Sequence, residues 1–206
     1  MKSRRIGLVS LLAALFAVLT LTPLFAQRGA GQPAKTVEEP ALIDVGPVPA
    51  FELVDQNGSA FSSAQLAGKI WVADFFLTSC QGACPVMARH MLALQDYYKN
   101  NDKVRFVSLS VDPETDTAAV LAEYAKSNEA DNARWHFLTG PLAEIHRMAG
   151  EEGFKVGVPD NPMAHSQRFI LVDAKGHIRG YYDGMDQMSV RTLAADIDRL
   201  LANPEL

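Results

Sequence analysis

One stretch of the sequence, residues 69–91, constrains the fold more than any other. It reads KIWVADFFLTSCQGACPVMARHM, an apolar run followed by a short polar loop that holds both cysteines, Cys80 and Cys84. Pro85 comes next, and apolar side chains then recur at steps of three and four residues: Met87, Met91, Leu94 and Tyr98. This order predicts a buried strand, a tight turn and an amphipathic helix with proline in its first turn.

The predicted helix gives both cysteines a special electrostatic environment. Backbone N–H groups at a helix N-terminus have no partner within the helix, and the helix dipole favours negative charge there. A thiolate forms more easily in such a place. We therefore expect the chemistry of this protein to lie at Cys80 and Cys84.

The first 26 residues differ in character from the rest. Three basic residues, Lys2, Arg4 and Arg5, precede an apolar stretch that ends at the small residue Ala26. Residues 1–26 are therefore predicted to be an export signal or, because residues 6–26 approach the roughly 20 residues that cross a bilayer, a membrane anchor. No cysteine lies near the end of this segment, which excludes a lipid-anchored lipoprotein. The predicted location is the extracytoplasmic, periplasmic side of the membrane.

Composition divides the remaining chain into a linker, residues 27–46, and a folded domain, residues 47–206. Three of the 19 basic residues precede residue 27, which leaves 16 basic against 24 acidic residues, a formal charge of −8. An acidic domain has no electrostatic reason to bind nucleic acid or anionic lipid. We therefore expect the domain to bind neither.

The order of the predicted elements indicates the fold. Two apolar runs, residues 70–77 and 104–111, are separated by the predicted helix, which is typical of parallel strands buried on both faces. A second helix is expected to begin at Asp116 as its N-cap and to end near residue 128. Further extended segments are expected at 135–138, 154–158, 168–172 and 177–182, and further helices at 141–150 and 188–202. This order predicts an α/β, thioredoxin-like fold with a central mixed sheet flanked by helices.

The spacing of the cysteines leaves several functions open. Thioredoxin-type oxidoreductases use Cys-x-x-Cys, whereas three residues separate Cys80 and Cys84. A four-residue step in the first turn of a helix places two sulfurs on one side, within reach of one soft metal ion. Two thiolates and a neutral imidazole suit copper, above all Cu(I), and also zinc. A structural disulfide is the simpler alternative in an exported chain.

A third ligand would have to come from one of five histidines. His165 immediately precedes the strand 168–172, which is expected to lie beside the strand that leads to Cys80. It is therefore the candidate ligand, and the alternative is a loop imidazole that caps a strand. The other four are expected on exposed or core positions and not as ligands: His90, His136, His146 and His177.

Five blocks of the sequence together resemble the SCO/SenC family, whose members are membrane-anchored copper chaperones of cytochrome c oxidase assembly. The blocks, in family order, are TSCQGACP (78–85), VDPE (111–114) with Asp116-Thr117, WHFLTG (135–140), HS (165–166) and FILVD (169–173). The resemblance covers residues 51–184, almost the whole domain. It implies a thioredoxin-like fold and copper held by Cys80, Cys84 and His165.

The resemblance leaves two functions open. The first is a metallochaperone, and so not an enzyme, that delivers copper to the cytochrome c oxidase subunit that carries the CuA site. The second is a thiol–disulfide oxidoreductase that keeps the copper-ligating cysteines of that subunit reduced, with Cys80 and Cys84 as a redox disulfide. Other periplasmic copper or thiol-redox proteins are further candidate partners.

Overall fold

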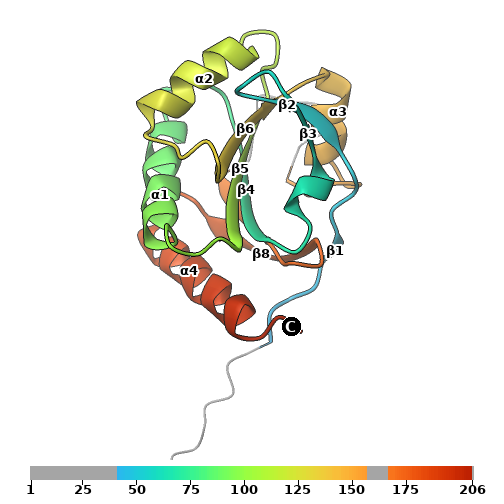
Figure 1. The fold of residues 1–206 in the computed structure, drawn as a ribbon, viewed down its shortest axis with the longest axis vertical. Coiled ribbons are helices and arrows are strands. Elements are labelled where there is room, and N and C mark those ends of the chain that lie inside the picture. Colours follow the sequence, from blue (N-terminus) through green and yellow to red (C-terminus); the bar gives the residue numbers. More distant parts are fainter. Residues whose placement is uncertain (1–40, 157–166, 206) are drawn as a thin grey trace, which may run out of the picture. The chain divides into compact units, whose positions relative to one another are not determined.

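A computed structural model describes residues 41–156 and 167–205. Within these residues, eight strands form one mixed sheet in the order β1-β8-β7-β4-β5-β6-β2-β3 (Figure 1). The strands are β1 (Gly46–Pro47), β2 (Glu52–Asp55), β3 (Ala60–Ser62), β4 (Ile70–Phe76), β5 (Val104–Ser110), β6 (Trp135–Thr139), β7 (Arg168–Val172) and β8 (His177–Asp183). The helices are α1 (Cys84–Tyr97), α2 (Ala118–Ser127), α3 (Leu142–Ala149) and α4 (Gln187–Ala202), with a short 3-10 helix, η1 (Ser63–Leu66).

Strand β4 lies at the centre of the sheet, and all seven of its residues are buried. It pairs in parallel with β5, where Phe76 lies opposite Ser110, and antiparallel with β7, where Ala73 lies opposite Ile170. Because β7 runs against β4, the start of β7 lies at the edge of the sheet where β4 ends. The chain leaves that same edge toward the two cysteines.

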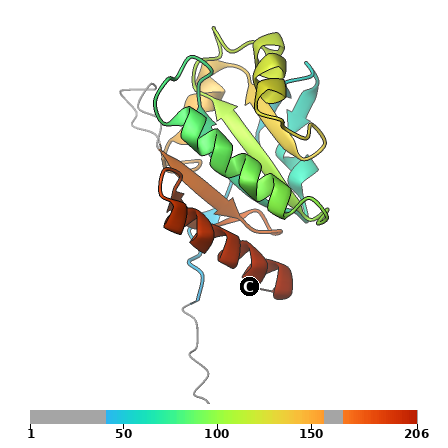
Figure 2. The same ribbon diagram turned by 90° about the vertical axis from the view of Figure 1, so that its left-hand side faces the viewer.

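Helices cover both faces of the sheet. Figure 1 shows α1, α2 and α4 on one face and α3 on the other, and α1 and α4 lie side by side in Figure 2. The hydroxyl of Tyr98 ties these two helices together by donating to the Ala194 carbonyl of α4 (2.8 Å). The stripe predicted for α1 faces the core, because its four side chains are no more than 4 % exposed: Met87, Met91, Leu94 and Tyr98.

A buried ion pair lies at the end of the sheet that is opposite the cysteines. Asp173, at the turn between β7 and β8, accepts from Arg179 at 2.9 Å, and both side chains are almost fully buried. Arg179 also donates to the Ile43 carbonyl (2.8 Å), and the Val45 amide donates to the Ile178 carbonyl (3.0 Å). The segment that precedes β1 is thereby bonded along β8.

The structure confirms the predicted thioredoxin-like fold, with its mixed sheet and flanking helices. The strands β4, β5 and β6 are parallel neighbours and β7–β8 is an antiparallel hairpin, as the order of the elements predicted. One local prediction is wrong in its described part, because Phe154 lies in a turn instead of an extended segment. Its fully buried ring packs edge-on against the rings of Trp71 and Phe75 of β4. The turn thereby contributes a side chain to the hydrophobic core.

The predicted export signal or anchor, residues 1–26, lies outside the described residues. Among the residues that the structure describes, no helix is both long enough and apolar enough to cross a membrane. Residues 41–46 are the described part of the predicted linker.

Candidate functional site

The two cysteines lie at the junction of β4 and α1. Cys84 is the first residue of α1 and is 3 % exposed, while Cys80 lies in the preceding loop and is half-buried. Pro85 occupies the first turn of the helix, as predicted. Both cysteines are thiols in this structure. The fold thus brings one accessible and one buried sulfur to the same helix N-terminus.

The environment makes the two thiols chemically unequal. Burial raises the pKa of Cys80, but the thiol of Cys84 and the backbone N–H groups of Cys84, Gly82 and Ala83 outweigh it and lower this pKa below 9.0. Burial, and then the neighbouring Cys80, raise the pKa of Cys84 to about 12. The backbone N–H of Leu77 acts in the opposite direction and lowers this pKa. Cys80 is therefore the thiol that ionises first, as expected for a sulfur near unpaired backbone N–H groups.

A buried carboxyl group lies beneath Cys84 in the core. Asp74, two residues before the end of β4, accepts a hydrogen bond of 2.5 Å from the Ser108 hydroxyl, which accepts in turn from the indole N–H of Trp135 (2.9 Å). Burial raises the pKa of Asp74 to about 7, and its negative charge contributes to the raised pKa of Cys84. An acidic residue inside an otherwise apolar run is the sequence signal that indicates such a buried carboxyl group.

The loop before Cys80 is fixed by a second buried carboxyl group, that of Asp116. Asp116 is fully buried and accepts from the Thr78 backbone N–H (3.1 Å), the Thr78 hydroxyl (2.5 Å) and the Ser110 hydroxyl (2.6 Å). The prediction that Asp116 caps the following helix is wrong. Thr117 caps α2 instead, because its side chain accepts from the Val120 amide while the Asp116 carboxylate points at the cysteine loop.

The predicted third ligand, His165, lies outside the described residues. The described residue Gln167, two positions later, lies close to α1. Its carbonyl accepts from the Gly184 amide (2.8 Å), and a Cβ placed on Gly184 would lie 2.9 Å from Cε of Met87 and 3.2 Å from that carbonyl oxygen. Met87 is three residues after Cys84. Gln167 and Gly184 therefore lie near the first turn of α1.

The other four histidines have separate surroundings. His90 bonds through Nδ1 to the Gly184 carbonyl (2.8 Å), and His177 pairs with Asp44 at 3.0 Å. The ring of His136 packs 4.6 Å from that of Phe61, and His146 is exposed on α3. In the described part of the chain, no group of three or more His, Cys, Asp or Glu side chains forms a cluster that could hold a metal ion.

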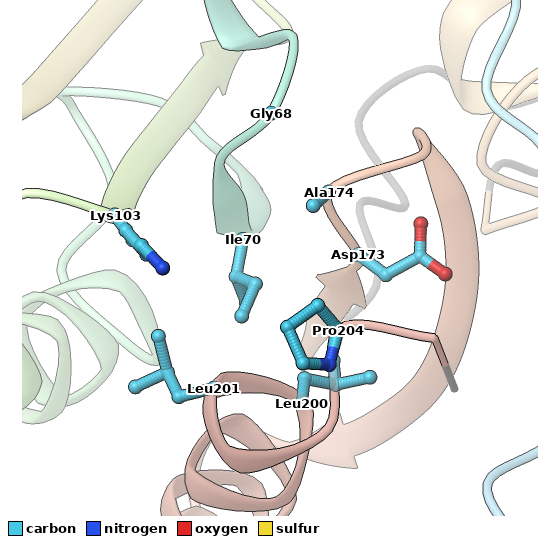
Figure 3. Close-up of a pocket in the computed structure, with 8 residues that line it drawn as sticks. All are labelled: Gly68, Ile70, Lys103, Asp173, Ala174, Leu200, Leu201 and Pro204. Atoms are coloured by element: carbon cyan, nitrogen blue, oxygen red, sulfur yellow. The ribbon is translucent and has the colours of Figure 1, made fainter.

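A small pocket at the other end of the sheet does not compete with this site. Its volume is about 90 Å³, and the apolar residues that line it include Ile70, Leu200, Leu201 and Pro204 (Figure 3). Pockets for small-molecule ligands usually have volumes of about 300–1,000 Å³. The pocket is too small for such a ligand, and it lies where β4 begins, far along the strand from the cysteines.

Comparison with known proteins finds a family model and a relative that each match more than three quarters of the chain. The family model described as SCO1/SenC matches residues 45–202. A Bacillus subtilis protein named SCO1 protein homolog is 32 % identical over 167 residues, which cover 78 % of this chain and 84 % of that protein.

Solved structures agree with this match. A SCO1/SenC family lipoprotein from Bacillus anthracis has a TM-score of 0.69 and 32 % identity, over 77 % of this chain and 97 % of that one. BsSco, described as a member of the Sco family of cytochrome c oxidase assembly proteins with a disulfide switch, has a TM-score of 0.66 and 33 % identity, over 74 % and 92 %. Bradyrhizobium japonicum ScoI with copper bound has a TM-score of 0.59 and 28 % identity, over 75 % and 99 %.

Proposed function

Because this chain belongs to the SCO1/SenC family, we propose that it binds one copper ion and delivers it to cytochrome c oxidase during assembly. The proposed ligands are Cys80, Cys84 and His165, and the proposed recipient is the CuA site of the oxidase. The observation that carries the proposal is the pair of sulfurs at the start of α1, one of which has a lowered pKa. Thiolates and imidazole are the ligands that Cu(I) prefers.

The geometry of the described flanks supports His165 as the third ligand. Gln167 lies beside Met87 in the first turn of α1, and two residues of extended chain reach about 7 Å. The start of β7 and the end of β4 also share one edge of the sheet. This short span supports an imidazole two residues before Gln167 as the group that approaches the sulfurs.

The unequal thiols assign different tasks to the two cysteines. The more exposed Cys80 ionises first and is the sulfur that meets incoming copper. Cys84 gives up its proton only when it binds the metal, since a metal ligand must be deprotonated. Copper affinity is therefore expected to fall as the pH falls. The thiolates supply charge and soft donor atoms, and burial of Cys84 restricts access of water to the site.

Copper titration of the reduced protein tests the ligand set. We expect one tightly bound copper ion per chain, and a loss of at least about 100-fold in affinity for Cys80→Ser, Cys84→Ser or His165→Ala. His146→Ala, which changes an exposed histidine on α3, is the matched control and should bind as the wild type does. One tight copper ion per chain in both cysteine variants would overturn the assignment.

A second function, reduction of the oxidase cysteines, is favoured by the same asymmetry of the thiols. A half-buried cysteine with a lowered pKa beside a more deeply buried thiol is the arrangement in which one cysteine attacks a disulfide and the other resolves the mixed disulfide. This reaction uses the cysteines and no imidazole ligand. Copper delivery and disulfide reduction therefore differ in whether His165 is required.

Complementation separates the two functions. In a strain without this protein, oxidase activity is expected to fall and to recover in part with added copper. Copper delivery predicts that His165→Ala fails to restore oxidase activity, as Cys80→Ser does. Full activity with His165→Ala and none with Cys80→Ser would favour the reductase.

We further propose that residues 1–26 export the chain and that the domain acts on the periplasmic side of the membrane, tethered by residues 6–26 or released by cleavage. The linker 27–46 would then join the membrane segment to the domain 47–206. The basic residues Lys2, Arg4 and Arg5 favour a cytoplasmic N-terminus. N-terminal sequencing of the mature chain from membrane and soluble fractions decides between anchor and cleaved signal.

A further inference from the structure

The carboxylate of Asp116 is a buried acid that copper binding does not use directly. Its side chain has no exposure to solvent, and it accepts three hydrogen bonds, two from Thr78 and one from Ser110. Within the described residues it has no ion-pair partner. Burial of a carboxylate without a cation is costly and persists where the hydrogen bonds compensate for lost hydration.

These hydrogen bonds join the turn after β5 to a loop 38 residues earlier in the sequence. Ser110 ends β5, and its hydroxyl oxygen also accepts from the Asp112 amide (3.1 Å). The Asp116 amide donates to the Asp112 carbonyl (2.8 Å), which closes the turn after β5. Thr78, 38 residues earlier, follows the end of β4. The carboxylate therefore fixes the cysteine loop against the end of the neighbouring strand.

The fixed residue, Thr78, lies in the short segment between the end of β4 and Cys80. Leu77 precedes it. Cys80 follows two residues later, and its amide donates to the Leu77 carbonyl (3.3 Å). A change in the position of Thr78 moves the backbone on both sides. The distance and relative orientation of the two sulfurs depend on that backbone.

We propose that Asp116 is a positioning residue: through Thr78 it holds the loop in the shape that sets the reactivity of the Cys80–Cys84 dithiol. Removal of the carboxylate loosens the loop, and Cys80 is then held less firmly at the N-terminus of α1 and beside Cys84. The dithiol should become less reactive and should form its disulfide less readily. For copper affinity, though not for the dithiol, this inference rests on the proposed function.

The test measures the dithiol without copper. The protein is equilibrated with reduced and oxidised glutathione, so that two protein thiols and one oxidised glutathione give one protein disulfide and two reduced glutathione molecules. The alkylation rate of Cys80 is measured against pH in parallel. For Asp116→Asn we expect the disulfide-forming equilibrium constant to fall at least about tenfold and the alkylation rate at pH 8 to fall about threefold or more.

Variants of Thr78 keep the test decisive if Asp116→Asn does not fold. Thr78→Val removes the hydroxyl donor at nearly constant volume and should change both quantities in the same direction as Asp116→Asn. Thr78→Ser keeps the hydroxyl and the backbone N–H, so it should behave as the wild type does. Asp173→Asn alters the buried carboxylate at the other end of the sheet, and it should lower thermal stability while both dithiol quantities stay within twofold.

Two outcomes overturn the inference. One is that Thr78→Val, and Asp116→Asn if it folds, lower thermal stability but leave the glutathione equilibrium and the alkylation profile within twofold of wild type. The other is that Asp173→Asn changes both dithiol quantities as much as Thr78→Val does, because the effect would then be one of general stability. If the wild type binds no copper, the proposed function fails while these measurements still decide the role of Asp116.

Discussion

Buried aspartates stand at both ends of the central sheet, and they are stabilised in different ways. At the end where β7 turns into β8, Asp173 is paired with the cation Arg179 and accepts from two amides of its own turn, those of Lys175 and His177. At the cysteine end, within the described residues, Asp74 and Asp116 accept only from hydroxyl and backbone N–H groups.

This difference indicates that the end of the sheet at Asp173 serves stability and that the end at the cysteines serves function. The pair at Asp173 neutralises its own charge and bonds the segment before β1 to the sheet, so its contribution is to stability. Among the residues that the structure describes, no cation pairs with the carboxyl groups at the cysteine end, and the charge of Asp74 helps to raise the pKa of Cys84. Titratable groups with shifted pKa values gather where chemistry is done. The following predictions test whether the two ends are independent.

The largest expected effect is at the thiols themselves. The pKa of Cys80 is lowered below 9.0, whereas that of Cys84 is raised to about 12. At pH 8 we therefore expect iodoacetamide to modify Cys80 at least about 100-fold faster than Cys84 in the reduced protein. Mass spectrometry of the two cysteine peptides over time measures the ratio. Equal rates would show that the buried carboxyl group and the burial of Cys84 do not make the thiols unequal.

The next largest effect is expected at the structural end. Arg179→Met leaves the buried Asp173 without its cation, which should lower the free energy of unfolding by about 3–5 kcal/mol. Arg191→Met, on the exposed face of α4, is the matched control and should change it by less than about 0.5 kcal/mol. Urea denaturation gives the free energies. If Arg179→Met also changes the alkylation ratio of the cysteines, the two ends are coupled.

The third prediction concerns pH and Asp74. The pKa of Asp74 is raised from 3.8 to about 7 in the folded protein, so the folded state holds the proton more tightly than the unfolded state does. The contribution of Asp74 to the free energy of unfolding is therefore most favourable at acidic pH. It is lost as the pH rises through about 7, where Asp74 must ionise in the folded protein. Wild type should therefore lose roughly 2–3 kcal/mol relative to Asp74→Asn between pH 5 and pH 8.

Denaturation of both proteins at pH 5, 6, 7 and 8 measures that difference. Ser108→Ala provides a further check, because the Ser108 hydroxyl lowers the pKa of Asp74. Loss of this hydroxyl should move the pH dependence of stability to higher pH. A difference between wild type and Asp74→Asn that stays constant over this range would show that Asp74 is ionised in the folded state throughout.

Local patterns in the sequence were enough to predict most of the fold. In residues 69–91 a continuous apolar run is followed by apolar residues at steps of three and four, and the structure has β4, the loop and α1 in that order. The position of β7 beside β4 followed from the order of strands and helices. Such features depend on neighbours in the chain or on the small number of ways in which elements pack.

The polar contacts of the site could not be predicted in the same way. An aspartate before a threonine at the start of a helix has the same sequence pattern whether its side chain caps that helix or bonds elsewhere. Asp116 bonds to Thr78, 38 residues away, so only the packed structure decides. Cys80 and Cys84 were predicted from their spacing and are neighbours in the structure. His165 stays a prediction, because it lies outside the described residues.

The smallest expected effect is at Asp186. It tests whether any carboxylate at the cysteine end of the sheet changes the reactivity of the two thiols, whatever its hydrogen bonds. Asp186, two residues after Gly184, caps α4 by accepting from the Ser189 amide (2.9 Å). Asp186→Ala should lower the free energy of unfolding by about 1 kcal/mol through the lost cap, and Asp186→Ser should restore most of it. Neither variant should alter the alkylation ratio or the glutathione equilibrium, because the only described contact that this carboxylate makes is to its own helix and none reaches the cysteine loop. Urea denaturation and the two thiol assays on the same preparations check this. A change in the thiols with Asp186→Ala would mean that any negative charge at this end of the sheet tunes them, and the hydrogen bonds of Asp116 to Thr78 would then not be what distinguishes it.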